Sequence, residues 1–120
     1  MATKDFNTAT LTAKFTFLEP TTTSDTTLFT VGANKVFKIQ TLTLCNRHTS
    51  AITVQVYVTP NGSALNARHK IVHDLPLGIG ESLSLEAICE GMMLGEGDFI
   101  SVKSSVASVL SVHLTGVEGA

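Results

Sequence analysis

Hydrophobic and polar residues alternate one by one along most of this chain. The clearest run is residues 51–59, where every second position is apolar until Pro60, Asn61 and Gly62 end the segment. Its apolar positions are Ile52, Val54, Val56 and Val58, and the positions between them are Thr53, Gln55 and Tyr57. A two-residue period puts one row of side chains in a core and the other in water, which is typical of a half-buried antiparallel strand. No long segment has the 3.6-residue period of a helix, so the sequence predicts an all-β protein.

Clusters of turn-forming residues divide the chain into eight predicted strands. These strands are residues 8–18, 27–31, 36–45, 51–59, 69–73, 81–88, 98–104 and 108–117. Residues 63–68 fit either a loop or one irregular helical turn. Eight strands at regular spacing predict an antiparallel β-sandwich, and we expect an eight-stranded jelly roll. The pattern does not fix the strand order, because a plain sandwich and a jelly roll share it.

The alternation also predicts which side chains face the core. The apolar row of the first strand ends in two aromatic residues, and we expect most of the six phenylalanines to point inward. The members of this row are Ala9, Leu11, Ala13, Phe15 and Phe17, and inward positions are also predicted for Leu83, Leu85, Ala87, Leu110, Val112 and Leu114. Phe37 and Ile39 share one face of the third strand, whereas Leu42 and the residues in phase with it share the other. A β-bulge near Gln40 and Thr41, or a strand passing from one sheet to the other, would account for this change.

Length and composition predict one domain with its own core. The chain has 120 residues, of which 43% are hydrophobic, so neither disulfides nor metals are needed to replace a core. We place the β-sandwich domain at residues 8–120 and a flexible polar arm at residues 1–7, with Phe6 as the arm's one large apolar side chain. Charged residues make up only 15% of the chain, against roughly 25% in typical domains. Low charge fits a protein that packs against copies of itself, and it equally fits ordinary β-protein composition.

Charge and hydropathy disfavour two classes of partner. The net charge is −2 and the lysines and arginines are scattered, so we expect no nucleic-acid partner. No segment approaches the ~20 apolar residues that span a bilayer, so we expect no membrane partner. The first residues have no secretory signal, which predicts a product made in a cytoplasm. Cys45 and Cys89 could pair only if their strands face each other, and the alternative is two free thiols in apolar surroundings.

Candidate catalytic and metal-binding residues are few. His69 and His73 share a face if they lie on a strand, but they would be about 13 Å apart, too far to share an ion. Glu81, Glu96 and Asp98 lie in turns, where acids usually accept hydrogen bonds from their own backbone or face solvent. No glycine-rich phosphate loop precedes a helix. We therefore predict a protein that is not an enzyme and has no cofactor or metal.

Tyr57 is the one candidate for contact with a sugar. The chain has no Trp and a single Tyr, and we expect the Tyr57 ring on the outer face of its strand. Sugar sites normally show exposed aromatic platforms, so a carbohydrate-binding module is disfavoured. The alternative role of Tyr57 is packing against a neighbouring strand or another subunit.

Three segments carry a resemblance to a known group of proteins. They are Val31-Gly32-Ala33-Asn34-Lys35 before a long strand and Asn46, then Leu77-Gly78-Ile79-Gly80-Glu81-Ser82-Leu83-Ser84-Leu85, then Leu94-Gly95-Glu96-Gly97-Asp98-Phe99-Ile100-Ser101-Val102. Glycine supplies unusual backbone angles at a strand entrance, and Asp caps the turn before an alternating strand. Over about residues 27–118 this order resembles small β-sandwich virion proteins of tailed bacteriophages, found among head decoration (cement) proteins and tail-associated components.

The resemblance implies a structural role in the virion, without catalysis. Our first expectation is a decoration protein that binds the major capsid protein or another virion protein on the outer head surface, and that forms a homo-oligomer, expected to be a trimer. The alternatives are a tail or fibre adaptor and, from another class, a glycan-binding module. Phe6 and Tyr57 are the residues we predict to contact partners. An arm anchored on a neighbouring copy through Phe6 would add many weak contacts across a lattice.

Overall fold

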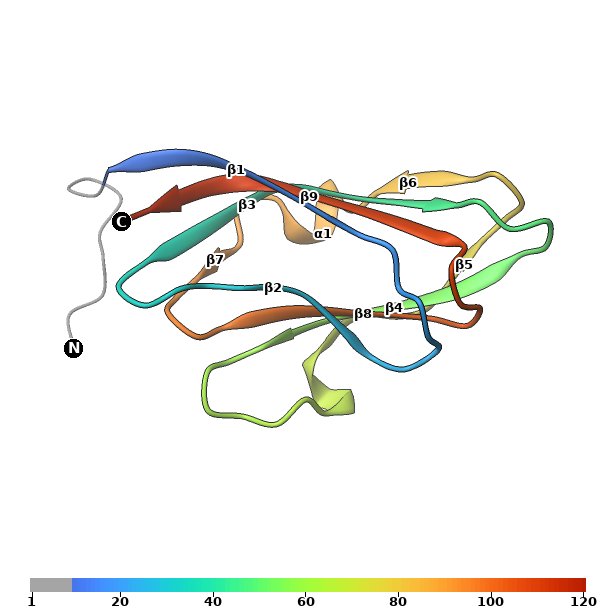
Figure 1. The fold of residues 1–120 in the computed structure, drawn as a ribbon, viewed down its shortest axis with the longest axis horizontal. Helices are drawn as coiled ribbons and strands as arrows, with labels where there is room; N and C mark the ends of the chain where they lie inside the picture. Colours follow the sequence, from blue (N-terminus) through green and yellow to red (C-terminus); the bar gives the residue numbers. More distant parts are fainter. Residues whose placement is uncertain (1–9) are drawn as a thin grey trace.

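The computed structural model describes residues 10–120, which form two antiparallel β-sheets packed face to face (Figure 1). The protein is therefore a β-sandwich. In chain order its elements are β1 (Leu11–Leu18), β2 (Thr26–Thr30), β3 (Val36–Asn46), β4 (Ile52–Thr59), the 3-10 helix η1 (Ala67–His69), β5 (Lys70–Leu77), β6 (Ser82–Ser84), α1 (Glu86–Cys89), β7 (Met93–Leu94), β8 (Phe99–Ser104) and β9 (Leu110–Gly119).

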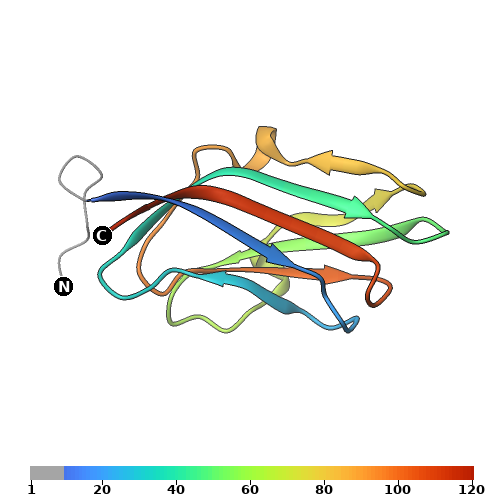
Figure 2. The same ribbon diagram turned by 45° about the horizontal axis from the view of Figure 1, so that its top comes forward.

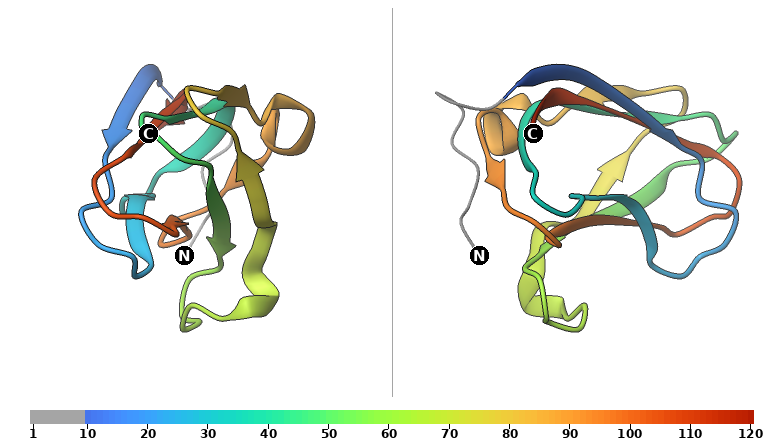
Figure 3. Two further views of the ribbon diagram at one scale, coloured as in Figure 1. Left: turned by 90° about the vertical axis from the view of Figure 1, so that its right-hand side faces the viewer. Right: turned by 60° about the vertical axis from the view of Figure 1, so that its left-hand side comes forward.

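Each sheet contains strands from both halves of the chain. The first sheet has the order β1-β9-β3-β6, with the two-residue β7 also paired to β3. The second sheet has the order β2-β8-β4-β5. Figure 2 shows β1 in blue at the margin of the first sheet, beside β9 in red. The two layers and the space between them, which side chains fill, are seen in the turned views of Figure 3.

The core lies between the sheets and is built from the inward rows of the central strands. Its fully buried side chains include Phe37, Ile39, Leu42, Leu44, Val54, Val56, Ile100, Val102, Val112 and Leu114. The inward rows predicted for the third, fourth and last strands are thereby confirmed at most positions. The predicted bulge is also confirmed, because the register between β3 and β9 shifts between Ile39 and Thr41. That extra residue lets Phe37 and Leu42, which differ in phase, face the same core.

The segment after Gly80 differs from the prediction of one strand over 81–88. Only Ser82–Ser84 pairs with β3, and Glu86–Cys89 is one turn of helix. Leu85 and Cys89 are both buried, at the four-residue spacing that a helical turn brings to one side. Ala87, predicted to face inward, is exposed. The strand predicted at 69–73 is longer and spans Lys70–Leu77, and residues 10–120 form nine strands rather than eight because of β7.

The first strand turns its apolar row the opposite way from the prediction. Phe15 and Phe17 are 61% and 53% exposed, and Leu11 in the same row is 54% exposed. The register explains this orientation, because Thr16 is paired with the buried Leu114 and therefore points to the core side. The prediction of inward-facing Phe15 and Phe17 is wrong. The predicted arm, residues 1–7 with Phe6, lies outside the described residues.

Candidate interaction surface

Tyr57, one of the two predicted contact residues, lies beneath other parts of the chain. Its side chain is 4% exposed, because η1 and the segment around it lie against β4 on the outer side of the second sheet (Figure 1). The Tyr57 hydroxyl donates to Gln55 Oε1 at 3.2 Å, and Lys70 Nζ lies 5.8 Å from the ring centroid. Burial, with the nearby Asp25 carboxylate, raises the pKa of Tyr57. The ring lies on the outer face of its strand, as predicted, but it is covered by η1, so this geometry does not support a contact role for Tyr57.

A polar cluster lies on the second sheet, along the β4–β5 pair. Asp74 Oδ1 accepts from Gln55 Nε2 at 2.9 Å, and Asp74 Oδ2 lies 3.2 Å from His73 Nε2. His73 Nδ1 is in turn 3.0 Å from Lys70 Nζ. His73 and Asp74 are exposed, and Gln55 and Lys70 are half-buried. The four groups already hydrogen-bond to one another, and such surface networks contribute little to stability. They lie where the register between β4 and β5 shifts twice.

The turn carboxylates bind backbone amides, as predicted. Glu81 Oε1 accepts from Gly78 N at 2.7 Å within one turn. Asp98 accepts from Gly95 N with one oxygen and from Asn61 N with the other, both at 2.8 Å. Glu96 Oε1 accepts from the amide of Asn34 at 2.8 Å. Asp98 and Glu96 therefore connect different loops of the sandwich, Glu81 closes its own turn, and each acid accepts from backbone amides.

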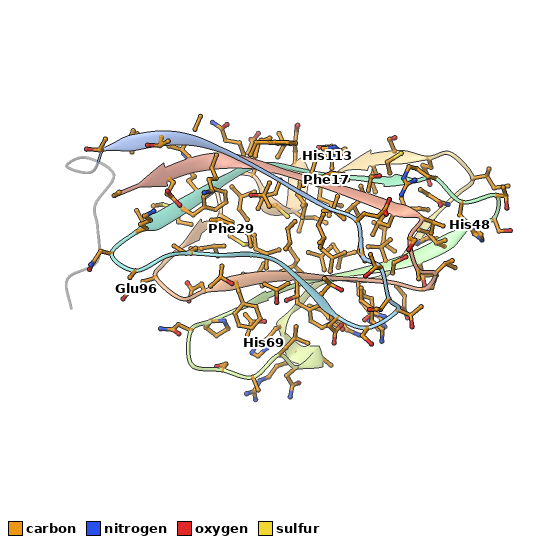
Figure 4. The ribbon with its side chains drawn as sticks, viewed as in Figure 1. Phe17, Phe29, His48, His69, Glu96 and His113 are labelled. Carbon is orange, nitrogen blue, oxygen red and sulfur yellow. The ribbon has the colours of Figure 1, made fainter. Side chains whose placement is uncertain are left out.

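The histidines lie on different parts of the molecule. Figure 4 shows His48 at one end of the sandwich, His69 at the end of η1 and His113 on the first sheet. His69 Nδ1 accepts from the amide of Asn66, which closes the η1 turn. Within residues 10–120, no group of three or more His, Cys, Asp or Glu side chains is arranged to hold a metal ion.

The two cysteines are free thiols on different sides of the first sheet. Cys89 is buried in the core, and this burial raises the pKa of its thiol. Cys45 is partly exposed and is paired with Ser111 and Ser82 on the outer face. The structure therefore contains no disulfide between them.

The outer face of the first sheet has few charged side chains: Lys38 lies within it, and the Arg47–Glu19 ion pair borders it where Arg47 Nε donates to Ser111 Oγ. The strand registers arrange it in transverse rows, which run from β1 across β9 and β3. These rows are Ala13–Val117–Lys38–Met93, Phe15–Thr115–Thr41, and Phe17–His113–Thr43–Ser84. Lys38 is the one formally charged side chain in them. The outer face of the second sheet differs, because Lys70, His73, Asp74 and Lys103 lie along it.

An apolar strip forms the margin of this weakly charged face. We define the β1 strip as Leu11, Ala13, Phe15 and Phe17, the outward row of β1. The imidazole of His113 on β9 contacts both aromatic rings: it stacks with Phe15 at a centroid distance of 5.8 Å and is tilted against Phe17 at 5.0 Å. Figure 4 labels Phe17 and His113 side by side on this face. Exposed apolar side chains gathered on one face are typical of a protein-binding surface. The β1 strip is therefore the candidate functional site.

Sequence reasoning found this row of residues but assigned it to the core. Alternation alone could not decide which row of β1 faces the core. The other row contains Lys14, Thr16 and Leu18, and a row of this composition can also face inward. Lys14 lies on the core side at the sheet margin, with its Nζ 5.8 Å from the centroid of the Phe29 ring.

Comparison of the sequence with protein-family models and with curated proteins gives no match. Among residues 10–120, neither helix is long and apolar enough to cross a membrane.

Proposed function

We propose that the protein is a non-catalytic structural protein of a tailed-phage virion, a decoration protein that binds the outer head surface as a homo-oligomer. The observation that carries this proposal is the β1 strip, which exposes Phe15 and Phe17 on a sheet face with few charged side chains. Large apolar side chains gathered on one face are uncommon on free monomers and are typical of surfaces that bind another protein. The virion itself, rather than another assembly, is inferred from the sequence resemblance.

The strand order supports a finer description of the fold. We infer an eight-stranded jelly roll, with β7 counted as a short addition to the edge of the first sheet. The chain then forms two four-stranded sheets: the sheet β1-β9-β3-β6 packs against the sheet β2-β8-β4-β5. Jelly rolls are common in viral capsid proteins and in lectins, so the inferred fold is compatible with the virion proposal and with a glycan-binding module.

Two observations favour an assembly role over the glycan-binding alternative. The single tyrosine of the chain is buried at Tyr57 and offers no platform for a sugar ring. The outer face of the first sheet has hydroxyl groups, but neighbouring Thr41 and Thr115 already hydrogen-bond to each other at 2.6 Å. The available surface is therefore more suited to another protein surface than to a polyol.

The proposal is tested on particles of the phage whose genome encodes this chain. Gradient-purified virions are labelled with gold-conjugated antibody against the chain and viewed by electron microscopy. Label distributed over the heads supports the decoration role, and particles lacking the gene should then lose DNA at lower temperature. Label confined to the tail would replace the proposal with the adaptor alternative. Virions without label would contradict both.

A further inference from the structure

We propose that β1 pairs edge to edge with β1 of a second copy of the chain, antiparallel and about a two-fold axis at Phe15. This inference rests on the homo-oligomer in the function proposed above, and it names the surface that forms it. The occupant of the β1 strip is then a second copy, whose own strip continues the same apolar row across the axis.

Among residues 10–120, no strand pairs with the outer edge of β1. β1 is the terminal strand of the first sheet, and within residues 10–120 only β9 pairs with it. Thr10 and Ala120 exchange both of their backbone hydrogen bonds, at 3.0 and 3.1 Å. In an antiparallel pair, residues that hydrogen-bond to the neighbouring strand alternate with residues whose backbone groups point away from it. Since Thr10 bonds to Ala120, which follows β9, the even-numbered residues of β1 bond to β9. The N–H and C=O groups of Leu11, Ala13, Phe15 and Phe17 therefore point away from the sheet, toward a potential partner strand.

β1 lacks the features that protect other strand edges from pairing. Proteins block exposed edges with short strands, prolines, bulges or charged side chains. Of the other terminal strands, β6 and β7 have only three and two residues, β2 has a register shift between Thr27 and Phe29, and β5 has two shifts and contains Pro76. β1 has eight residues in unbroken register and no proline. Its one charged side chain, Lys14, is directed to the core side.

The position of Lys14 selects the register. Only odd-numbered residues have outward-pointing edge groups, so a symmetric pair must place an odd residue opposite an odd residue. Two registers overlap nearly all of β1. In one of them Ala13 faces Phe15 and Lys14 faces Lys14 of the second copy, and like charges directly opposite are destabilising. In the other, Phe15 faces Phe15, Ala13 faces Phe17 and Lys14 faces Thr16. The second register avoids the repulsion and joins the aromatic residues of the two strips.

The size of the strip predicts a weak, reversible pair. Each aromatic ring can bury roughly 150–250 Å², and about half of that is exposed here. Two strips together therefore bury less than the roughly 1,200–2,000 Å² of a stable interface. Hydrogen bonds between the edges add to this area, and repeated contacts in a particle would add avidity. A two-fold contact gives a dimer, whereas the sequence-based expectation is a trimer. The mass of the protein in solution distinguishes the two.

A charge-exchange experiment tests both the surface and the register. We use the full chain as wild type, as Phe15→Lys and as Phe15→Glu, and measure association by sedimentation velocity over a concentration series. On the two-fold axis each variant places like charges opposite each other, so each alone should dimerise at least about tenfold more weakly than wild type. An equimolar mixture of the two should restore a dimer, because the ammonium group introduced in one copy then faces the carboxylate introduced in the other. Thr43→Lys and Thr43→Glu are matched controls on the same sheet face, two strands away, and should dimerise like wild type.

A backbone variant keeps the test independent of side-chain charge. Ala13→Pro removes an outward N–H without breaking a hydrogen bond to β9, so the domain should stay folded by circular dichroism and lose dimerisation. Ala13→Thr keeps the N–H and should still dimerise. If the Phe15 variants and Ala13→Pro associate like wild type, the inference is overturned. The proposed function would still stand if the gold label is found on the phage heads. If the variants change dimerisation as expected but virions carry no gold label, the inference is supported and the proposed function is contradicted.

Discussion

Phe17 and His113 face each other directly across the β1–β9 pair, with ring centroids 5.0 Å apart and an angle of 56° between the rings. Both side chains lie on the outer face of the first sheet, where Phe17 remains 53% exposed. The contact holds the exposed ring in place without burying it. Phe17 therefore belongs to a preformed surface and not to the core that keeps the domain folded.

Replacing Phe17 should affect stability far less than replacing a core residue of the neighbouring strand. We expect Phe17→Ala to lower the free energy of unfolding by about 0.5–1 kcal/mol, the value of a cross-strand aromatic contact. Leu114→Ala, at a buried position on β9, should cost about 2–5 kcal/mol. Urea denaturation of both variants measures the difference. Equal losses would show that Phe17 is a core residue and would contradict the orientation of β1.

Gly116 should be intolerant of a side chain. A Cβ at this position would lie 2.3 Å from Lys38 O and 2.4 Å from the Phe37 ring, beside the β3 bulge. Gly116→Ala should therefore destabilise the domain by at least about 1–3 kcal/mol through overpacking. Gly78→Ala is the control, because its Cβ would meet nothing closer than Glu81 Oε1 at 3.7 Å. A Gly116→Ala protein with a wild-type denaturation midpoint would contradict the register between β3 and β9.

Asp98 should stabilise the end of the sandwich by joining two turns. Its carboxylate accepts from Gly95 N and from Asn61 N, which lie in different loops. Removing it leaves both amides without this acceptor, so Asp98→Ala should cost about 1–3 kcal/mol. Glu90→Ala removes an exposed acid after α1 and should change stability by less than about 0.5 kcal/mol. Thermal and urea unfolding of the two variants give the comparison, and similar midpoints would contradict the bridging role.

Tyr57 should titrate above its ordinary pKa of 10.0, because it is buried and lies near Asp25. Since the folded-state pKa is raised, the neutral phenol stabilises the fold fully below about pH 10, and this stabilisation is lost as pH rises through the folded-state pKa. The chain has one Tyr and no Trp, so the near-ultraviolet tyrosinate absorbance reports Tyr57 alone. In Tyr57→Phe the corresponding loss of stability at alkaline pH should be absent. A tyrosinate midpoint at or below pH 10 would refute this prediction.

Much of the sandwich could be predicted because its central strands have one apolar and one polar row. In β4 the apolar row from Ile52 to Val56 could only be the core row, and the break between Ile39 and Leu42 correctly indicated a bulge. Around Leu85 and Cys89 the same residues satisfy a strand period and one helical turn, so the sequence could not distinguish them. The burial of Tyr57 depends on η1, a tertiary contact that alternation does not encode.

The candidate site could not be predicted because β1 is a terminal strand. Alternation identifies two faces of a strand but not which face is inside, and in β1 neither row is wholly polar. The orientation is set by pairing with β9, where Thr16 and Leu18 face buried residues. The apolar row of β1 is directed outward, which is why sequence reasoning assigned it to the core. The same orientation gives the β1 strip its proposed role.

The central claim, that the protein associates with itself through β1, is tested most directly by the solution mass of the wild-type chain over a range of concentrations. Light scattering after gel filtration should give a mass that rises from the 12.7 kDa of one chain toward about 25 kDa as concentration increases. A mass of about 38 kDa, three chains, would contradict the two-fold contact but keep a homo-oligomer. A mass of 12.7 kDa at every concentration would contradict self-association through the β1 strip.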